Sequence, residues 1–389
     1  MKTRKITDNL TWFGAIDWDR RLFDSLIPLP DGTTYNAYLV RGNEKTALVD
    51  TVDPSMTDVL LRQLEDVPCV DYVISNHAEK DHSGAIPAVL NRYPDAVLLT
   101  SDRAVNVLVD SLNIDPQRIR VVKDKETVDL GSRTLEFLYT PWVHWPETMV
   151  TYLQEENILF SCDFLGCHIA SSELYVTDKG RVGEAAKRYF AEIMMPFRVH
   201  IRKHLDTLSK YPIKMIAPSH GPIHTDPTFI LDAYREWSAE EPKNLVAIPF
   251  VSMHGSTAKM VDCLVENLID KGVNVERYDL ADSDIGKLAT ALVDAATIVV
   301  ATPTVLGGPH PLAAYAAVLA NALKPKAKYL SVIGSYGWGG KSVEALAGMI
   351  PNLKVEVVEP YLTKGSPDKT DCDAIEKLAE DIAARHKAL

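Results

Sequence analysis

The sequence predicts an α/β protein with two domains, a sheet sandwich flanked by helices followed by a doubly wound parallel sheet. The first part has many short β-branched and aromatic runs with few helices between them, whereas the second part alternates strand and helix strictly. A polar stretch with a proline, residues 238–243, separates the two parts and follows a helical run. We therefore predict a first domain at residues 1–240 and a second at 241–389.

The expected elements follow from these local patterns. In the first domain we expect strands at residues 34–40, 46–50, 69–75, 96–100, 118–122, 134–140, 149–154 and 158–162, and a helix over 56–66. In the second domain we expect five strands, at residues 244–250, 274–280, 296–303, 328–335 and 353–360. Helices are expected between them, and a last helix from about residue 371. Five strands with intervening helices imply a parallel sheet with helices on both faces.

Composition narrows the function classes. The chain is 46% hydrophobic and 24% charged, as globular proteins are, and its net charge of −12 argues against nucleic acid as a partner. Its five cysteines are scattered and form no C-x-x-C pair, which predicts neither a disulfide framework nor a structural zinc site. The sequence shows no signal peptide and no apolar run of the ~20 residues that a membrane helix needs. We expect a cytoplasmic protein that is not bound to a membrane.

The strongest chemical signal is NHAEKDHSG, which directly follows an apolar strand. It brings two histidines and two acidic residues into one tight loop: His77, Glu79, Asp81 and His82. Three more candidates also follow strand-like segments: His144, Asp163 and His220. Four imidazoles and three carboxylates are too many ligands for one small ion, and they suit two ions with one carboxylate bridging them.

Each of these histidines and acidic residues, considered alone, could also have a structural role without a metal. Any one candidate could be a polar cap at a strand end, although burying the whole NHAEKDHSG cluster without a metal would be costly. His200 and His204, spaced i and i+4, fit a surface helix better than a metal site. His168 could support the site from behind or be an ordinary polar residue.

The pattern H-x-[HE]-x-D-H followed by a distant His, Asp and His resembles the metallo-β-lactamase superfamily, whose zinc hydrolases usually have His in place of Glu79. That exchange, the HWPETM segment after His144 and the second domain resemble the flavodiiron proteins (A-type flavoproteins) over nearly the whole chain. The resemblance implies a metallo-β-lactamase-like αββα sandwich and a flavodoxin-like domain. It also implies that one iron is held by His77, Glu79 and His144, that the other is held by Asp81, His82 and His220, and that Asp163 bridges them. In some members the histidine matching His82 turns away from the metal. A carboxylate at residue 79 favours iron or manganese over zinc.

Three loops of the second domain predict a flavin site. The first opens a helix with hydroxyls and backbone N–H groups that suit a phosphate, as in flavodoxins; it comprises Ser252, Met253, His254, Gly255, Ser256 and Thr257. The second follows the third strand and comprises Thr302, Pro303, Thr304 and Val305. The third follows the fourth strand and comprises Ser335, Tyr336, Gly337, Trp338 and Gly339. An ordinary helix cap or core packing of the aromatic residues could explain any one of these loops, but together they favour FMN.

The resemblance implies an oxidoreductase in which FMN passes electrons to the diiron site, which reduces dioxygen to water, nitric oxide to nitrous oxide, or both. The flavin of one chain and the iron of another would meet in a head-to-tail homodimer, or in a homotetramer made of two such dimers. Because the chain has no C-x-x-C pairs of a fused rubredoxin, we expect an external donor, a rubredoxin-like protein or a reduced deazaflavin. The alternatives are a dinuclear zinc hydrolase with an accessory flavin domain, and an electron carrier that uses its first domain only as a scaffold.

Overall fold

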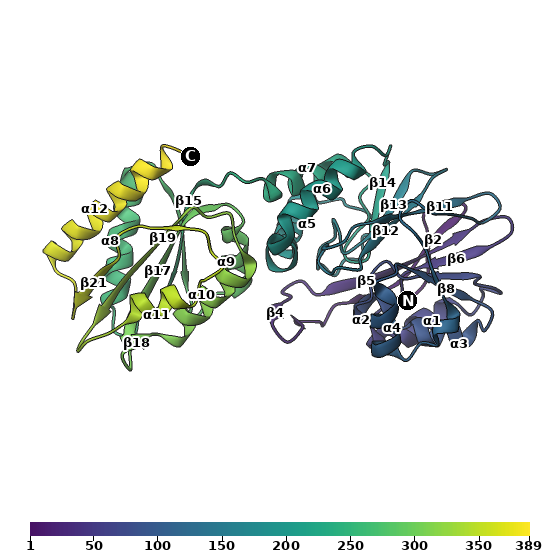
Figure 1. Ribbon diagram of the computed structural model, residues 1–389, viewed down its shortest axis with the longest axis horizontal. Helices are drawn as coiled ribbons and strands as arrows, with labels where there is room; N and C mark the ends of the chain where they lie inside the picture. The colour runs from purple at the N-terminus through teal and green to yellow at the C-terminus, as the bar shows by residue number, and fades with distance from the viewer. The chain divides into compact units, whose positions relative to one another are not determined.

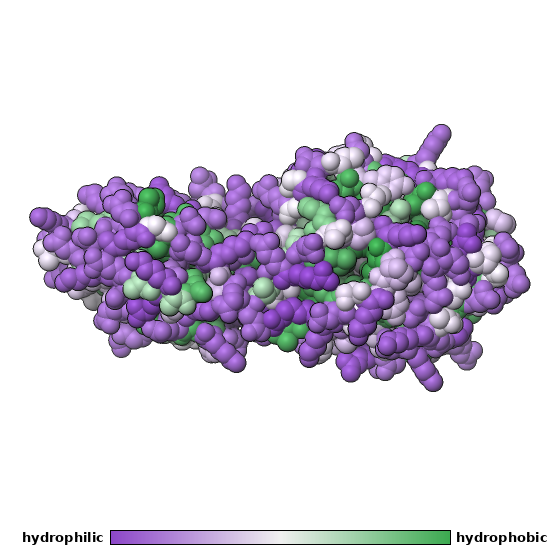
Figure 2. Space-filling model, turned by 90° about the horizontal axis from the view of Figure 1, so that it is seen from above, coloured by the Kyte–Doolittle hydropathy of each residue, from purple (hydrophilic) through white to green (hydrophobic).

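The computed structural model describes residues 1–389 and divides into two compact units. The first comprises Met1–Tyr189 and Phe197–Ser238, and the second comprises Phe190–Pro196 and Ala239–Leu389. Figure 1 shows the elements of each unit. No helix is both long and apolar enough to cross a membrane. On the face drawn in Figure 2, hydrophilic residues predominate and hydrophobic ones gather only in small patches.

Two sheets form the centre of the first unit. The larger sheet has, in spatial order, β1 (Arg4–Lys5), β2 (Leu10–Asp17), β5 (Thr33–Arg41), β6 (Thr46–Val49), β7 (Tyr72–Ile74), β8 (Val97–Thr100) and β9 (Ile119–Val121). The smaller has β10 (Thr127–Asp129), β11 (Thr134–Tyr139), β12 (Met149–Leu153), β13 (Ile158–Cys162) and β14 (Met215–Pro218). A separate hairpin joins β3 (Leu22–Phe23) to β4 (Ile27–Pro28).

Alternation along the strands places one hydrophobic core between the sheets and another beneath the helices. Along β5, Tyr38 and Val40 belong to the core with residues of the smaller sheet such as Phe137. Ala37 and Leu39 instead pack with residues of the helices. The helices of that outer layer are α1 (Thr57–Gln63), α3 (Ile86–Arg92) and α4 (Ala104–Leu112).

Three further helices lie beside the smaller sheet (Figure 1): α5 (Lys179–Tyr189), α6 (Arg198–Leu208) and α7 (Pro227–Ser238). The layers therefore run helix, sheet, sheet, helix, which is the sandwich that the sequence predicts. The eight-residue strand β2 lies outside the strands that we predicted. Its LTWFGAID sequence is almost continuously apolar and has no clear alternation, so the period of two that identifies a half-buried strand is missing.

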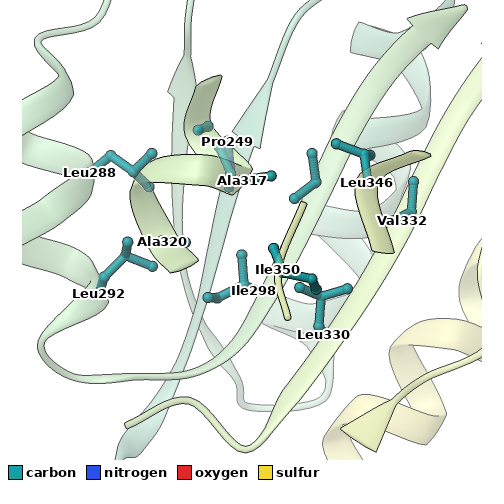
Figure 3. Close-up of a pocket in the computed structure, with 12 residues that line it drawn as sticks. Pro249, Leu288, Leu292, Ile298, Ala317, Ala320, Leu330, Val332, Leu346 and Ile350 are labelled. Atoms are coloured by element: carbon teal, nitrogen blue, oxygen red, sulfur yellow. The ribbon is translucent and has the colours of Figure 1, made fainter. Parts of the chain in front are cut away.

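The second unit is a parallel sheet with helices on both faces. Its strands lie in the order β16 (Asn274–Asp279), β15 (Lys243–Phe250), β17 (Ala295–Val305), β19 (Tyr329–Tyr336) and β20 (Glu356–Val357). Helices α8 (Ser256–Asp270) and α12 (Lys369–His386) cover one face, and α9 (Ile285–Leu292), α10 (Pro311–Leu323) and α11 (Ser342–Gly348) cover the other (Figure 1). A void of about 10 Å³ lies between the sheet and these last three helices. All of its lining side chains are apolar (Figure 3), so it is a packing defect rather than a binding site.

The fifth strand of this sheet differs from our prediction. We expected one strand over residues 353–360, but only β20 forms there, and β21 (Tyr361–Lys364) then pairs with the far end of β19. Pro360 stands between the two pieces and has no N–H to donate to a ladder, which accounts for the break. The strand order 2-1-3-4-5 is that of the flavodoxin-like sheet.

Candidate metal and flavin sites

The seven predicted metal ligands converge in the first unit. His77 and Glu79 come from the loop after β7, and Asp81 and His82 from the short helix α2 (Lys80–Ser83) directly behind it. The other three follow β11, β13 and β14 as the sequence pattern indicates: His144, Asp163 and His220. Parallel or neighbouring strands that end at the same edge aim their following loops at one point, and this brings residues 77 to 220 together.

The ligand atoms form two groups. His77, Glu79, His144 and Asp163 each offer an atom within 4.8 Å of the others, and the same holds for a second group of Asp81, His82 and His220. In the first group, the Nε2 atoms of His77 and His144 lie 3.1 Å and 3.2 Å from Glu79 Oε2. In the second, His220 Nε2 lies 3.0 Å from Asp81 Oδ2.

Asp163 faces both groups at once. Its Oδ2 atom lies 3.5 Å from His77 Nε2 and 3.3 Å from His144 Nε2. Its Oδ1 atom lies 2.9 Å from His82 Nε2 and 3.5 Å from His220 Nε2. One carboxylate oxygen toward each group is the geometry of a bridging ligand. His82 therefore turns its ring nitrogen into the cluster.

The electrostatics of the cluster fit cations. Burial lowers the pKa of His82, but the charges of Asp163 and Asp81 outweigh it and raise this pKa to about 9. Burial also opposes ionisation of Asp163, yet the neighbouring histidines hold its pKa well below the ordinary value. The Asp163 carboxyl group is thus ionised, and it is a negatively charged group at the centre of the cluster.

Several buried polar atoms of the cluster lie near oppositely charged groups but make no hydrogen bond. Both carboxylate oxygens of Asp81, both ring nitrogens of His82 and Oδ2 of Asp163 are buried without a hydrogen bond. Such atoms are costly to bury unless something else satisfies them. Two metal ions, each among histidine and carboxylate donors, would do so, and the donor set fits a pair of irons. That these seven residues bind the metal stays a prediction.

Residues that we did not single out hold the ligands in place. Glu147 is 2% exposed, and its Oε1 accepts a hydrogen bond of 2.6 Å from Nδ1 of His77. The carbonyl of Thr34 accepts the Nδ1–H of His220 at 2.6 Å. The Tyr189 hydroxyl donates to Oδ1 of Asp163 at 2.7 Å. Glu147 lies in the HWPETM segment, only three residues after His144, so the sequence could have indicated it as an acidic residue close to a predicted ligand. No sequence feature near Thr34 or Tyr189 indicates their contacts with the cluster.

Three further histidines that we weighed as candidates, His168, His200 and His204, have different surroundings. His168 is buried, its ring centroid lies 4.5 Å from that of His220, and its Nδ1 lies 2.9 Å from the Thr33 hydroxyl oxygen. His168 therefore packs against the predicted ligand His220 and is not itself part of either ligand group. His200 and His204 lie on α6, as expected, and Nε2 of His204 lies 2.9 Å from the Pro141 carbonyl oxygen.

The predicted flavin residues surround an open cavity of about 270 Å³ in the second unit. Its lining includes nine of the residues that we singled out: Met253, His254, Ser256, Thr257, Pro303, Thr304, Ser335, Tyr336 and Gly337. It also includes Gly365 and Ser366, which we missed. They directly follow β21, so their signal was a Gly-Ser turn at the carboxyl end of the last parallel strand.

The remaining predicted flavin residues lie outside the lining. Ser252 accepts a hydrogen bond of 3.1 Å from the Ala258 N–H. The Thr302 hydroxyl accepts the His310 N–H at 3.0 Å. Gly255 directly precedes α8 and has φ +86°, and Trp338 is 77% exposed. Val305 and Gly339 complete this group, and for all of them flavin contact stays a prediction.

The second predicted loop is partly strand. β17 continues through Val305 and pairs antiparallel with β18 (Gly308–Pro309), so the turn lies at Leu306 and Gly307. Gly307, like Gly255, has a positive φ, a conformation open to glycine without strain.

The cavity has the features that an FMN phosphate and ring need. It lies at the carboxyl ends of parallel strands, where ligands bind in this fold. The first turn of α8 adds backbone N–H groups and the hydroxyls of Ser256 and Thr257. A Cβ at Gly337 would meet nothing within 4 Å, which leaves space for a ring.

The chain is similar to known proteins over almost its whole length. Residues 33–221 match a family model described as ODP family beta lactamase. Over 391 residues the chain is 37% identical to a nitric oxide reductase of Moorella thermoacetica, covering 98% of each protein. It superposes on rubredoxin oxygen:oxidoreductase from Desulfovibrio gigas with a TM-score of 0.95 and 32% identity, covering 99% of each chain.

The flavodiiron protein from Giardia intestinalis gives a TM-score of 0.93 at 25% identity, with 100% of this chain and 97% of that chain covered. Both halves of the predicted α/β fold are thereby confirmed. The matched regions cover 98% and 99% of this chain and so include both the first and the second unit. The chain therefore belongs to the flavodiiron protein family, the type A flavoproteins.

Proposed function

We propose that this flavodiiron oxidoreductase reduces dioxygen to water, nitric oxide to nitrous oxide, or both, with electrons that reach two irons from FMN. The observation that carries the proposal is the pair of ligand groups that share Asp163. A single bridged pair of metals can bind both atoms of a small diatomic gas. A zinc hydrolase is not favoured, because the relatives named above are oxidoreductases and because Glu79 replaces a histidine.

FMN and two iron ions are the cofactors of this family. We assign His77, Glu79 and His144 to one iron and Asp81, His82 and His220 to the other. Asp163 would bridge them, in keeping with its two oxygens facing the two groups. When bound, the ferrous pair supplies the electrons that reduce the gas.

The protein contributes orientation and a dry, charged environment. Glu147 fixes the ring of His77 so that Nε2 points into the cluster, and the Thr34 carbonyl does the same for His220. Five of the seven ligands are at most 4% exposed, so water has little access to the inner side of the cluster. Glu79 and His144 have side chains 13% and 12% exposed, which favours gas entry from their side.

The electron donor and the assembly belong to the proposal as well. We propose a rubredoxin-like protein or a reduced deazaflavin as donor, since one relative is named for rubredoxin. We also propose a head-to-tail homodimer, or a homotetramer made of two such dimers, in which the flavin of one chain serves the irons of another. Sedimentation velocity tests the assembly: a monomer with full turnover would contradict it.

Rapid mixing tests the reaction. The protein is reduced anaerobically, mixed separately with dioxygen and with nitric oxide, and the return of oxidised-flavin absorbance is timed. We expect at least one gas to reoxidise the flavin at a rate no slower than steady-state turnover. The gas that reoxidises the flavin faster is the preferred substrate. Metal analysis accompanies it: about two zinc and no iron per chain, in protein produced with both metals present, would contradict the proposal.

Two ligand variants test the assignment. Asp163→Ala removes the shared carboxylate and Glu79→His restores a zinc-type ligand, so both should abolish gas reduction. Neither residue lies in the flavin unit, so FMN content should be unchanged. Unchanged turnover in both variants would contradict the assignment of these residues to the metal site.

A further inference from the structure

A cysteine side chain on one helix of the flavin unit lies against a second cysteine at the start of another helix. Cys263 is on α8 and Cys372 is in the first turn of α12, and the Cys263 Sγ lies 3.8 Å from the carbonyl oxygen of Cys372. Both side chains are partly exposed. The two residues are 109 positions apart, so only folding brings them together.

The helices that carry the two thiols are held in place. Met260 and Leu264 of α8 pack in one core with Ile375 and Ala379 of α12. A capping box of Asp368 and Asp371 fixes the start of α12. The Tyr361 hydroxyl also donates to Asp371 at 2.8 Å, which ties this first turn to β21. The approach of Cys263 to Cys372 is therefore built into the packing of α8 and α12.

We propose that Cys263 and Cys372 form a reversible intramolecular disulfide that links α8 to α12. The oxidant is a low-molecular-weight disulfide. The Cys372 thiolate attacks one of its sulfurs and forms a mixed disulfide, releasing one small thiol. Cys263 then loses its proton and displaces the second small thiol. Two protein thiols are thereby oxidised to one disulfide, and the small disulfide is reduced to two thiols.

The surroundings of Cys263 decide the order of these steps. Burial and a hydrogen bond with Cys372 raise the pKa of the Cys263 thiol to about 12. Cys263 is therefore protonated at neutral pH and is the slower nucleophile. Cys372, at a helix start, is left as the thiol that attacks first.

The position of the pair suggests what the bond would do. α8 begins at Ser256, which lines the flavin cavity, and α12 follows Ser366, which also lines it. A covalent link between these elements restricts the unfolded chain over a long loop, and this favours the folded flavin unit. Oxidation should therefore raise the temperature at which FMN is released.

The experiment uses the full chain with FMN bound. The protein is treated with oxidised glutathione, and its intact mass is measured with and without dithiothreitol. Free thiols are then alkylated in a second sample, and linked peptides are identified with and without dithiothreitol. We expect a loss of about 2 Da, a linked peptide pair containing Cys263 and Cys372, and reversal by dithiothreitol. The midpoint of FMN release should rise by several degrees in the oxidised protein.

Three serine variants sharpen the test. Cys263→Ser and Cys372→Ser should each abolish the linked pair and the rise in midpoint, while Cys69→Ser, which removes an exposed cysteine elsewhere, should keep both. A glutathione adduct that accumulates on wild-type Cys372 without a linked pair would overturn the proposal. So would a linked pair that contains Cys69, or a mass loss that persists in Cys263→Ser. These readouts are covalent and do not depend on gas reduction.

Discussion

At the scale of single residues, side chains outside the predicted ligand set decide how the predicted ligands are oriented. Glu147 accepts from Nδ1 of His77 and also from the Ala78 N–H at 3.2 Å. This pairing places the ring hydrogen of His77 on Nδ1 and directs Nε2 into the predicted metal cluster. Glu147 is therefore a positioning residue, and its removal should affect metal retention as well as rate.

Replacing Glu147 with Ala should lower iron affinity or activity by roughly 10- to 100-fold, because outer partners of metal-binding histidines contribute about that much. Glu147→Gln keeps an oxygen that can accept from Nδ1 and should lose less. Iron per chain and gas-dependent flavin reoxidation measure the effect, with FMN content as the control. Wild-type iron content and turnover in Glu147→Ala would contradict the assigned role.

His224 makes stability depend on pH. Burial lowers its pKa to about 4, although its hydrogen bond with the Leu165 carbonyl opposes the shift. Since the unfolded histidine titrates near 6.5, the unfolded chain takes up a proton that the folded chain refuses. The folded state should lose about 3 kcal/mol as the pH falls from 7 to 4 through this one group.

Urea unfolding followed by tryptophan fluorescence at several pH values tests this prediction. His224→Gln keeps an N–H that can reach the Leu165 carbonyl and has no proton to gain. The difference between wild type and variant should therefore shrink as the pH falls below 6.5. Parallel pH profiles for the two proteins would show that His224 does not titrate as described.

At the scale of elements, the flavin cavity depends on how closely the central strands approach one another. Gly334 of β19 pairs with Thr302 of β17 and with Leu362 of β21. A Cβ at Gly334 would overlap the Thr302 carbonyl oxygen. The strand ends that carry Pro303, Thr304 and Ser335 would have to separate to make room.

Gly334→Ala should destabilise the flavin unit by about 1–3 kcal/mol, the usual cost of overpacking, and should weaken FMN binding. Gly348→Ala is the matched control, because a Cβ at the end of α11 meets nothing within 4 Å. It should be neutral or stabilising by up to about 1 kcal/mol. FMN retention after gel filtration measures both, and equal retention would contradict the expected overlap.

At the scale of the whole molecule, each cofactor belongs to one unit. All seven predicted metal ligands lie in the first unit and the flavin cavity lies in the second. Five of the six tryptophans also lie in the first unit, and only Trp338 lies in the second. Tryptophan and flavin fluorescence therefore report on different units.

Removing iron with a chelator should lower the melting temperature seen by tryptophan fluorescence and leave the midpoint of flavin release nearly unchanged. The reason is that metal binds only where residues 77 to 220 have converged, so it stabilises the folded first unit by mass action. Adding ferrous iron back should restore the first transition. Equal shifts of both transitions would show that the units unfold together.

The sequence by itself determined the class of fold, most strand positions in the second unit, and the seven candidate metal ligands. Those features depend on local signals: hydrophobic periodicity, and polar residues that follow apolar strands. The tertiary structure alone decided that Glu147 and Tyr189 support the cluster, that Gly365 and Ser366 line the flavin cavity, and that Cys263 meets Cys372. The physical reason is that such contacts join residues far apart along the chain, and no local period records which distant side chains packing will bring together.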